Sequence, residues 1–422
     1  MFANLKQIFR PTNKDLRKRI LFTLFCLAIF AIGTNITVPG ASKITRELGF
    51  LQLLDLMAGG GLKNFSIFAL GVSPYITASI ITQILQMDII PYFKELKDEG
   101  YTGRQKINRI TRYIGILFAF VQGYLFSIAF LGSNDSALII KTTIVLTAGT
   151  SFLMWLGDQI TNKGIGNGMS LLIMAGILQT MPNTFITAFN DLIVNGSNLA
   201  AGIGVFSGFV LVYMFIIVGI IYIQEAERHI PIQYANKTNS AYGAKQSFLP
   251  IKLNSGGVIP VIFASTLLGI PTIIAEFLKN DAFKKFIENY INYQSLTGCI
   301  LYIALIFFFG YFYIYLTMNP EEMSKNLNNN GGYIPGVRPG KDTSKFITNI
   351  LSKVSFVGLL SLIIIAVLPI IFTHFSSLSA SVTIGGTGLL IVVGVALDTY
   401  KQLESSLISR SYKRRSNRLW KI

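Results

Sequence analysis

The sequence is poor in the residue types from which most catalytic and metal sites are built. Only 13% of its 422 residues are charged, and it contains two histidines and two cysteines. A soluble globular domain carries roughly twice that charged fraction. Cys26 and Cys299 lie far apart, each inside an apolar run, which excludes a disulfide framework and a CxxC metal or redox site. With 51% hydrophobic residues, the composition indicates an integral membrane protein.

Ionisable residues are also missing from the interior of the long apolar runs. Glu276, Asp398 and His374 lie only at the ends of such runs. Ion- and proton-coupled transporters use charged groups at membrane depth, and an intramembrane metalloprotease needs a His/Glu or His/Asp cluster. The sequence has no GxxxxGK[ST] phosphate-binding loop either. We therefore expect no enzyme activity, no catalytic residue, no metal and no cofactor.

Apolar runs long enough to cross a hydrocarbon core of ~30 Å occur ten times. Most Lys and Arg fall in the segments that lie on one side of the expected membrane, which places both termini in the cytoplasm by the positive-inside rule. The first run is too long for the core of a signal peptide and is expected to be a retained helix. The expected spans lie near 20–39, 65–87, 110–131, 137–157, 167–187, 203–224, 256–277, 296–318, 352–373 and 382–399.

Two internal echoes pair spans that are five apart. Residues 71–79 read GVSPYITAS and residues 257–265 read GVIPVIFAS, and GMSLLIMAG at 168–176 resembles GTGLLIVVG at 386–394. Because five is odd, two halves of five spans cross the membrane with opposite topology. We expect an all-α polytopic membrane protein of ten transmembrane helices in two inverted-repeat halves, residues 1–200 and 201–422. Chance similarity among apolar segments is the alternative.

A short apolar run after the first span ends in a triple glycine. It is too short to cross the membrane, so it either folds back between the helices as a re-entrant plug or lies in the interface as an amphipathic helix. The residues leave both possibilities open. The candidate plug and hinge residues are Leu51, Leu53, Leu54, Leu56, Met57, Gly59, Gly60 and Gly61.

The second, fifth, seventh and tenth spans are rich in Gly, Ser, Thr and Pro and are expected to face protein or water. Aliphatic residues four apart share one face of the second span, and the seventh span repeats that pair. If the four helices surround one axis, such residues form a ring that can seal by excluding water. Ordinary core packing explains the same pattern. The residues are Val72, Ile76, Ile173, Val258, Ile262 and Ile391.

Two expected cytoplasmic segments are longer than a connection requires and are candidate docking surfaces. The first, 225–255, mixes cations with prolines and includes Arg228, Lys237 and Lys245. The second, 319–351, frames Arg338 with the glycines and prolines of GGYIPGVRPG. A rigidly presented guanidinium suits bidentate contact with a carboxylate or phosphate. A topology signal explains the lysines equally well.

These motifs resemble the SecY family of protein-conducting channels over essentially the whole chain. The resemblance implies a ten-helix channel with a plug after the first span, an isoleucine-rich pore ring and a lateral gate between the second and seventh spans. The matching segments include FSIFALGVSPYITASI (65–80), GRQKINRITRY (103–113), FLMWLGDQITNKGIGNGMSLLIMAGI (152–177), LPIKLNSGGVIPVIFAS (249–265), NPEEMSKNL (319–327) and GGTGLLIVVGVALDT (385–399).

The resemblance also implies a function. Unfolded secretory proteins would cross the bacterial cytoplasmic membrane through this subunit, and membrane segments would leave it sideways into lipid. SecE and SecG would be membrane partners, SecA ATPase or the ribosome would dock in the cytoplasm, and preproteins with signal peptides would be the substrates. A secondary solute transporter and an accessory-system SecY paralogue are the alternatives, and the lack of buried ionisable groups counts against the transporter.

Carried over position by position, the family pattern adds some candidates and departs from others. The ring would include Met169, where isoleucine is common, and the gate would include Thr82, Gln83 and Ser265. His229 stands where a second basic residue is usual, and FAIGT at 30–34 lacks an arginine that often precedes the IG pair.

Overall fold

The chain folds mainly into helices, because an apolar segment in lipid must satisfy its backbone hydrogen bonds internally. The computed structural model describes residues 14–41, 55–86, 90–131, 135–194, 199–234, 247–278, 281–291, 295–376 and 380–419. The helices are α2 (Lys14–Gly33), α4 (Ser73–Leu85), α5 (Pro91–Asp98), α6 (Tyr101–Leu131), α7 (Ser136–Lys163), α8 (Gly168–Phe189), α9 (Leu199–Glu225), α10 (Ile259–Leu278), α11 (Asp281–Tyr290), α12 (Leu296–Thr317), α13 (Pro320–Asn329), α14 (Lys341–Ser376) and α15 (Ala380–Leu419). A π-helical turn, η2 (Asn190–Val194), continues α8.

Each of the ten expected spans overlaps one of these helices, so the polytopic helical fold is confirmed. Within the described ranges, six helical stretches are long and apolar enough to cross a membrane. They are Tyr101–Leu131, Ser136–Lys163, Gly168–Val194, Leu199–Glu225, Leu296–Asn329 and Lys341–Phe372. One of the other helices is short, since α4 has 13 residues.

The second expected span, 65–87, is helical only in its later part. Residues 58–72 form successive turns, and α4 begins at Ser73. Gly59, Gly60 and Gly71 have φ angles of 70°, 75° and 54°, a left-handed conformation that a right-handed helix cannot continue through. Pro74 then lies in the first turn of α4, where its missing N–H breaks no hydrogen bond.

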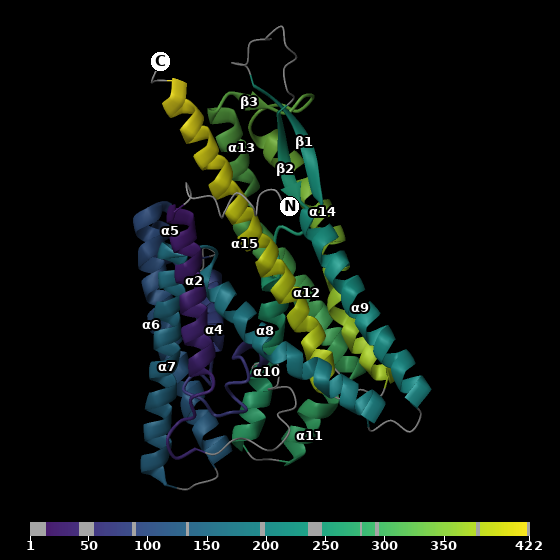
Figure 1. The fold of residues 1–422 in the computed structure, drawn as a ribbon. Helices are drawn as coiled ribbons and strands as arrows, with labels where there is room; N and C mark the ends of the chain where they lie inside the picture. The colour runs from purple at the N-terminus through teal and green to yellow at the C-terminus, as the bar shows by residue number, and fades with distance from the viewer. Residues whose placement is uncertain are drawn as a thin grey trace.

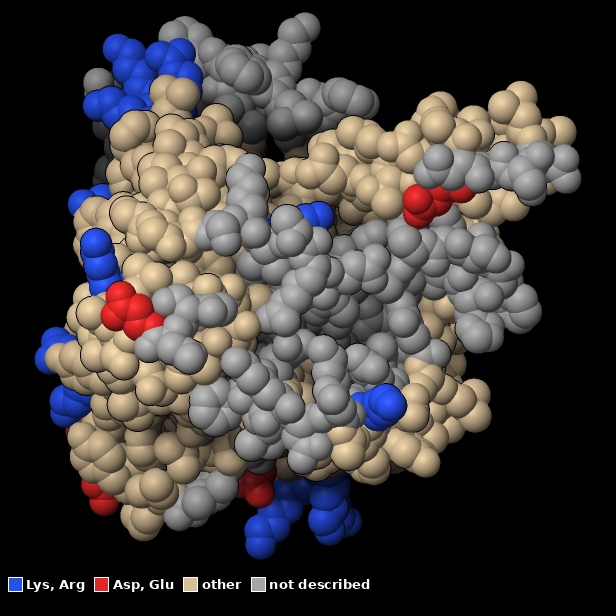
Figure 2. Space-filling model, turned by 90° about the horizontal axis from the view of Figure 1, so that it is seen from below, with Lys and Arg blue, Asp and Glu red and all other residues tan. Residues whose placement is uncertain are grey.

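The helices form two groups that meet at several places, including a contact between α10 and α6 (Figure 1). In the first group α4 packs on α6 and α6 on α7, and in the second α12 and α9 pack on α14. The groups meet where α8 packs against α15, which we call the α8–α15 seam, and where α4 meets α10, which we call the α4–α10 seam. Figure 2 views the molecule from the end at which α11 lies, and most described atoms on that face belong to uncharged residues.

A small antiparallel sheet, which the sequence did not predict, adds a β element to the expected all-α fold. β1 (Glu227–Tyr234) pairs with β2 (Ser247–Lys252) from Glu227↔Lys252 to Ile232↔Ser247, and β3 (Gly332–Tyr333) pairs with the end of β1. Ile230, Ile232 and Ile251 point into a separate core that α12, α13 and α14 complete. The two expected docking segments therefore form one folded unit, at the same end of the molecule as the C-terminal end of α15 (Figure 1).

Candidate functional site

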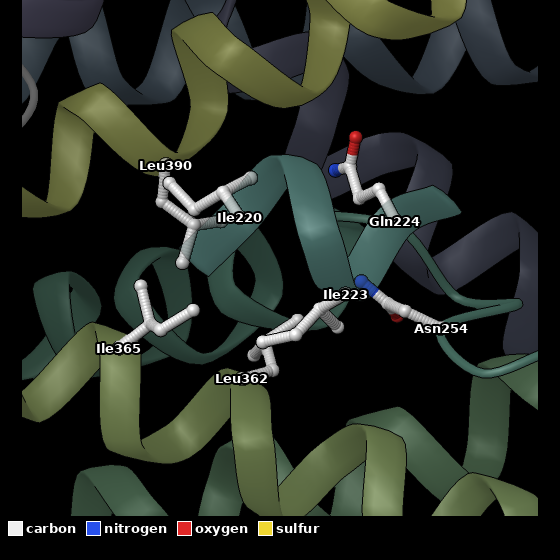
Figure 3. A pocket seen from close by; sticks show the side chains of 7 residues that line it. All are labelled: Ile220, Ile223, Gln224, Asn254, Leu362, Ile365 and Leu390. Atoms are coloured by element: carbon white, nitrogen blue, oxygen red, sulfur yellow. The ribbon is translucent and has the colours of Figure 1, made fainter. Parts of the chain in front are cut away.

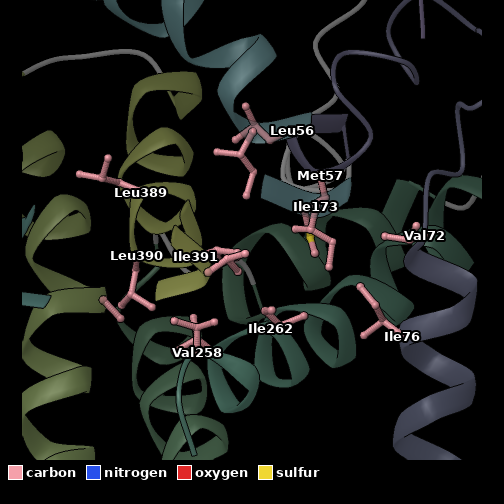
Figure 4. Close-up of a cluster of buried hydrophobic side chains, with 14 of the residues drawn as sticks. Leu56, Met57, Val72, Ile76, Ile173, Val258, Ile262, Leu389, Leu390 and Ile391 are labelled. Carbon is pink, nitrogen blue, oxygen red and sulfur yellow. The ribbon is translucent and has the colours of Figure 1, made fainter. Parts of the chain in front are cut away.

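Aliphatic side chains from α8, α10, α15 and the start of α4 meet in one buried cluster near the centre of the molecule. Figure 4 shows these side chains pointing toward one another from the separate helices. Their exposed fractions lie between 2% and 7%. All six of the aliphatic residues predicted for the ring belong to it: Val72, Ile76, Ile173, Val258, Ile262 and Ile391.

The two copies of the first echo, residues 71–79 and 257–265, have matching local structures. Gly71 and Gly257 occupy the same position in their nonapeptides and have φ angles of 54° and 60°. In each copy the N–H of the isoleucine donates to the carbonyl of the valine four residues earlier, at 3.1 Å for Ile76 and 3.2 Å for Ile262. The same left-handed turn thus precedes α4 and α10 and directs the valine and isoleucine of each into the cluster.

Met169 is placed differently from the other predicted ring residues. It is only partly buried, and its sulfur lies over Gly157 of α7, where an added Cβ would be 2.7 Å from Sδ. It packs against the edge of the same cluster, so its place in the ring stays a prediction. The sequence reasoning missed Leu389 and Leu390, which are buried beside Ile391 and which the shared LLI of the second echo could have indicated.

The segment that follows α2 folds back into the molecule, so the re-entrant alternative is the correct one. Leu56 and Met57 are buried in the same cluster as Ile173 (Figure 4). Gly176 of α8 permits this contact, because a Cβ there would be 2.6 Å from the Met57 carbonyl oxygen and 3.0 Å from the Gly59 nitrogen. The predicted plug residues Leu51, Leu53 and Leu54 lie outside the described residues.

Hydrogen bonds between residues close in sequence fix the shape of this segment. The Gly60 N–H donates to the Asp55 carbonyl at 2.8 Å, and the Lys63 N–H donates to Asp55 Oδ1 at 2.9 Å. An added Cβ on Gly61 would lie 2.8 Å from Ser66 Oγ, so the turn also needs its third glycine. A β-bridge between Thr37 and Ser66 ties the end of the segment to the chain after α2. The role of Asp55 was not anticipated from the sequence.

The predicted gate residues of α4 and α10 bond to their own helices. Ser265 Oγ donates to the Val261 carbonyl at 2.8 Å, and Gln83 Nε2 donates to Ser79 Oγ at 3.1 Å. Gln83 Oε1 is buried and accepts no hydrogen bond from the described residues. Among these residues, no side-chain hydrogen bond joins α4 to α10. The two helices therefore meet without a polar cross-link.

Thr82 is placed differently from the other two predicted gate residues. It lies one turn after Ala78, which faces α6: a Cβ added to Gly115 of α6 would be 3.7 Å from the Ala78 Cβ. Residues four apart share a helix face, so Thr82 lies on the side of α4 that faces α6. Because α10 also packs against α6, Thr82 stays a gate candidate with Gln83 and Ser265.

A short connector, Leu253–Val258, leads from the sheet to α10. The Leu253 N–H donates to the Ala226 carbonyl at 2.9 Å, and an added Cβ on Gly358 of α14 would be 2.0 Å from the Leu253 carbonyl oxygen. Asn254 Nδ2 donates to the Gly257 carbonyl at 3.1 Å. Asn254 also lines a cavity of about 10 Å³ with Gln224, Ile220 and Leu362 (Figure 3). That volume holds at most one water molecule.

The two predicted docking arginines are exposed on the folded unit that contains the sheet. Arg228 lies on β1, and Arg338 lies in the loop between β3 and α14. The Arg338 carbonyl accepts a hydrogen bond from Thr343 Oγ1 at 2.8 Å, and the Gly340 carbonyl accepts one from Ser324 Oγ at 2.9 Å. The loop is thus held by α13 and α14, as expected for rigid presentation. Lys237 and Lys245 lie outside the described residues.

His229, which departs from the family pattern, stacks on an aromatic neighbour. Its ring lies 4.1 Å from that of Phe248 on β2, with 20° between the ring planes. The stack covers part of an exposed surface of the sheet.

An ion pair near the ends of α6 and α7 corrects the expectation that the spans lack interior charge. Arg112 falls inside the expected span 110–131, and one of its guanidinium nitrogens lies 2.7 Å from Asp158 Oδ2. Both helices are longer than expected, since α6 begins at Tyr101 and α7 ends at Lys163. The pair therefore lies toward the helix ends rather than at mid-membrane.

These features define a class of protein. A polytopic helical protein with an aliphatic closure at its centre and a re-entrant segment packed against that closure is a membrane channel in a closed form. The comparisons with known proteins agree with this class.

The SecY family model matches residues 66–400. Protein translocase subunit SecY of Staphylococcus carnosus is 43% identical over 427 residues, covering 98% of this chain and 99% of the relative. The Staphylococcus aureus subunit is 44% identical with the same coverage. The chain belongs to the SecY family.

Solved structures share the fold. A protein-conducting channel matches with a TM-score of 0.68 and 21% identity over 93% of each chain. A SecY protein studied for its plug domain and Sec61 from a canine ribosome–channel complex each match with a TM-score of 0.67 and 20% identity over 93% of each chain. The fold that the sequence resemblance implied is thereby confirmed.

Proposed function

We propose that this protein is the protein-conducting channel subunit of a bacterial translocase, through which unfolded secretory proteins cross the membrane and from which apolar segments leave sideways into lipid. One observation carries the proposal: the aliphatic cluster closes the centre of the molecule where the two repeated helix pairs meet. A constriction of this kind excludes water and ions without any charge. Because its contacts are non-directional, it can also yield to chains of different sequence.

The proposed pore ring consists of residues with equivalent positions in the two echoes. Equivalent burial of both copies supports this assignment. An aliphatic ring contributed by several helices closes when the helices approach and opens when they part, without the loss of any hydrogen bond. The ring residues are Val72, Ile76, Ile173, Val258, Ile262 and Ile391, and Met169 packs against them.

The re-entrant segment is the proposed plug. Leu56 and Met57 lie in the cluster itself, and Gly59, Gly60 and Gly61 form the turn on which the segment would move. In one solved SecY protein the plug domain stabilises the closed state of the channel and maintains a membrane seal. The same role here would add a second barrier to the ring.

The α4–α10 seam is the proposed lateral gate. Its support is that Gln83 and Ser265 bond within their own helices, so the helices can separate without breaking a polar bond between them. Hydroxyl and amide groups on the opened faces would then meet water or a passing chain at low cost.

Partners would supply the energy, since the sequence has no nucleotide-binding loop. Arg228 and Arg338, with Lys237 and Lys245, are the proposed docking residues for SecA or the ribosome, and SecE and SecG are the proposed membrane partners. The solved Sec61 channel noted above was seen in complex with a ribosome. The proposed location is the bacterial cytoplasmic membrane with both termini in the cytoplasm, and residues 1–200 and 201–422 are the proposed inverted halves.

Co-reconstitution with SecE, SecG and SecA in liposomes tests the proposal. We expect ATP-dependent protection of a preprotein from external protease, and no protection when the signal peptide is deleted. Liposomes that lack this chain but contain the other components are the control. Uptake of small solutes without preprotein protection would contradict the channel function and favour a secondary transporter. Protection of only a few specialised preproteins would favour an accessory translocase.

A further inference from the structure

Gln179 of α8 makes a side-chain hydrogen bond to the chain just past α2, beside the re-entrant segment. Its Nε2 donates to Thr34 Oγ1 at 2.9 Å, and the Thr34 hydroxyl donates to the Ala31 carbonyl at 2.9 Å. Thr34 is fully buried, with 0% exposed. Because a buried hydroxyl cannot exchange its partner for water, this bond is a directional link between α8 and the end of α2.

The re-entrant segment passes directly over this link at its first glycine. An added Cβ on Gly59 would be 3.0 Å from Gln179 Oε1 and 3.3 Å from Thr34 Cγ2. The neighbouring Gly60 lies over Thr180, whose Cγ2 would be 3.5 Å from a Cβ there. The backbone of residues 59–60 therefore rests on a surface made by Thr34, Gln179 and Thr180.

The same turn of α8 also supports the residues before the glycines. Gly176 lies three residues before Gln179 and contacts the backbone of Met57, as described above. One face of α8 thus meets the whole stretch from Met57 to Gly60. Gln179 is the long flexible side chain on that face, and its bond to Thr34 keeps it out of the space that Gly59 occupies.

We propose that Gln179, held by Thr34, is a positioning residue that seats the re-entrant segment against the aliphatic cluster. The inference rests on the proposed function, in which that segment is the plug. Without the bond, the Gln179 side chain is free to rotate into the space that Gly59 occupies. Leu56 and Met57 then leave the cluster more often, and the channel conducts ions at rest.

Resting ion conductance of reconstituted channels tests this inference. Gln179→Leu and Thr34→Val each remove the bond with little change in side-chain volume. We expect each to raise resting conductance about fivefold, the size of effect that one neutral hydrogen bond gives. Translocation of a preprotein should be retained. Because both residues act through one bond, the double variant should leak no more than the leakier single variant.

Gln122→Leu is the matched control, since Gln122 is a partly buried glutamine on α6. Melting temperatures measured in parallel separate the positioning role from a purely structural one. A purely structural role would lower the melting temperature and the rate of translocation without raising resting ion conductance. Conductance of Gln179→Leu equal to that of Gln122→Leu overturns the inference. If Gln179→Leu does not accumulate, Thr34→Val decides by the same criterion. A wild-type protein that translocates no preprotein contradicts the proposed function itself, and the inference falls with it.

Discussion

The two seams that join the helix groups differ in the chemistry of their contacts. In the α8–α15 seam, Ile177 packs over Gly388, where an added Cβ would be 2.9 Å from the isoleucine, and Gly166 lies against Thr399. On the two helices of the α4–α10 seam, the predicted gate residues Gln83 and Ser265 bond within their own helices. Close apolar packing resists separation because parting leaves voids. Polar groups that bond only locally lose nothing when the helices part. We therefore propose that the α8–α15 seam stays closed while the α4–α10 seam opens.

Ile177→Ala should have the largest effect on stability, because it leaves a cavity in the closely packed seam. Ile177 is 1% exposed, and a loss of about 2–5 kcal/mol in unfolding free energy is typical of such a change. Ser265→Ala in the other seam should lose less than about 1 kcal/mol, since its hydroxyl bonds only to its own helix. Thermal unfolding in detergent measures both. Equal losses would remove the distinction between the seams.

Replacing Ile76 and Ile262 together with Gly should open the centre between the seams. Each isoleucine contributes about 1.5–3 kcal/mol of apolar burial, so resting ion conductance should rise at least about tenfold. Ile140→Gly with Ile144→Gly is the matched control, because both residues are more than half exposed on α7 and impose the same helix penalty. Conductance equal in the two double variants would count against the ring.

Arg338→Glu should impair translocation by about tenfold while leaving both seams closed. The charge reversal removes a charge-assisted contact to a cytoplasmic partner, which is typically worth about 1.5–3 kcal/mol. Co-purification of the membrane subunits checks that assembly is intact, and resting conductance checks the seams. Normal SecA-driven translocation would remove Arg338 from the docking surface.

Gln83→Leu should have the smallest effect on stability. It should make the α4–α10 seam more apolar, like the α8–α15 seam. The buried Oε1 has no donor among the described residues, so its removal should leave the melting temperature unchanged or slightly higher. Lateral release of an apolar segment should then slow by about fivefold. Protease protection of a model membrane segment measures this, with Gln122→Leu as the control. An unchanged rate would mean that the polarity of this seam does not set its opening.

Hydropathy predicted the helical membrane fold, and the sequence echoes predicted which helices meet at the centre. Neither could predict where α4 begins. The left-handed turns at Gly59 and Gly60 depend on contacts with α8 and Thr34, and the one at Gly71 depends on a contact with Ala58. The sheet was missed because β1 contains Pro231 and β2 contains Pro250, and proline within a run weakens a strand pattern. The directions of the Met169 side chain, over Gly157, and of Thr82, toward α6, also depend on tertiary packing and could not be predicted from the sequence.

Crosslinking from the ring to an arrested preprotein is the most direct test of the central claim. A photoreactive residue at position 76 or 262 should crosslink to a preprotein stalled during translocation, and one at Leu211 should not, because Leu211 is 69% exposed on α9 outside the cluster. Crosslinks at both ring positions and none at position 211 are the predicted result. A stalled preprotein that crosslinks at neither ring position would show that the translocating chain does not pass through the aliphatic centre.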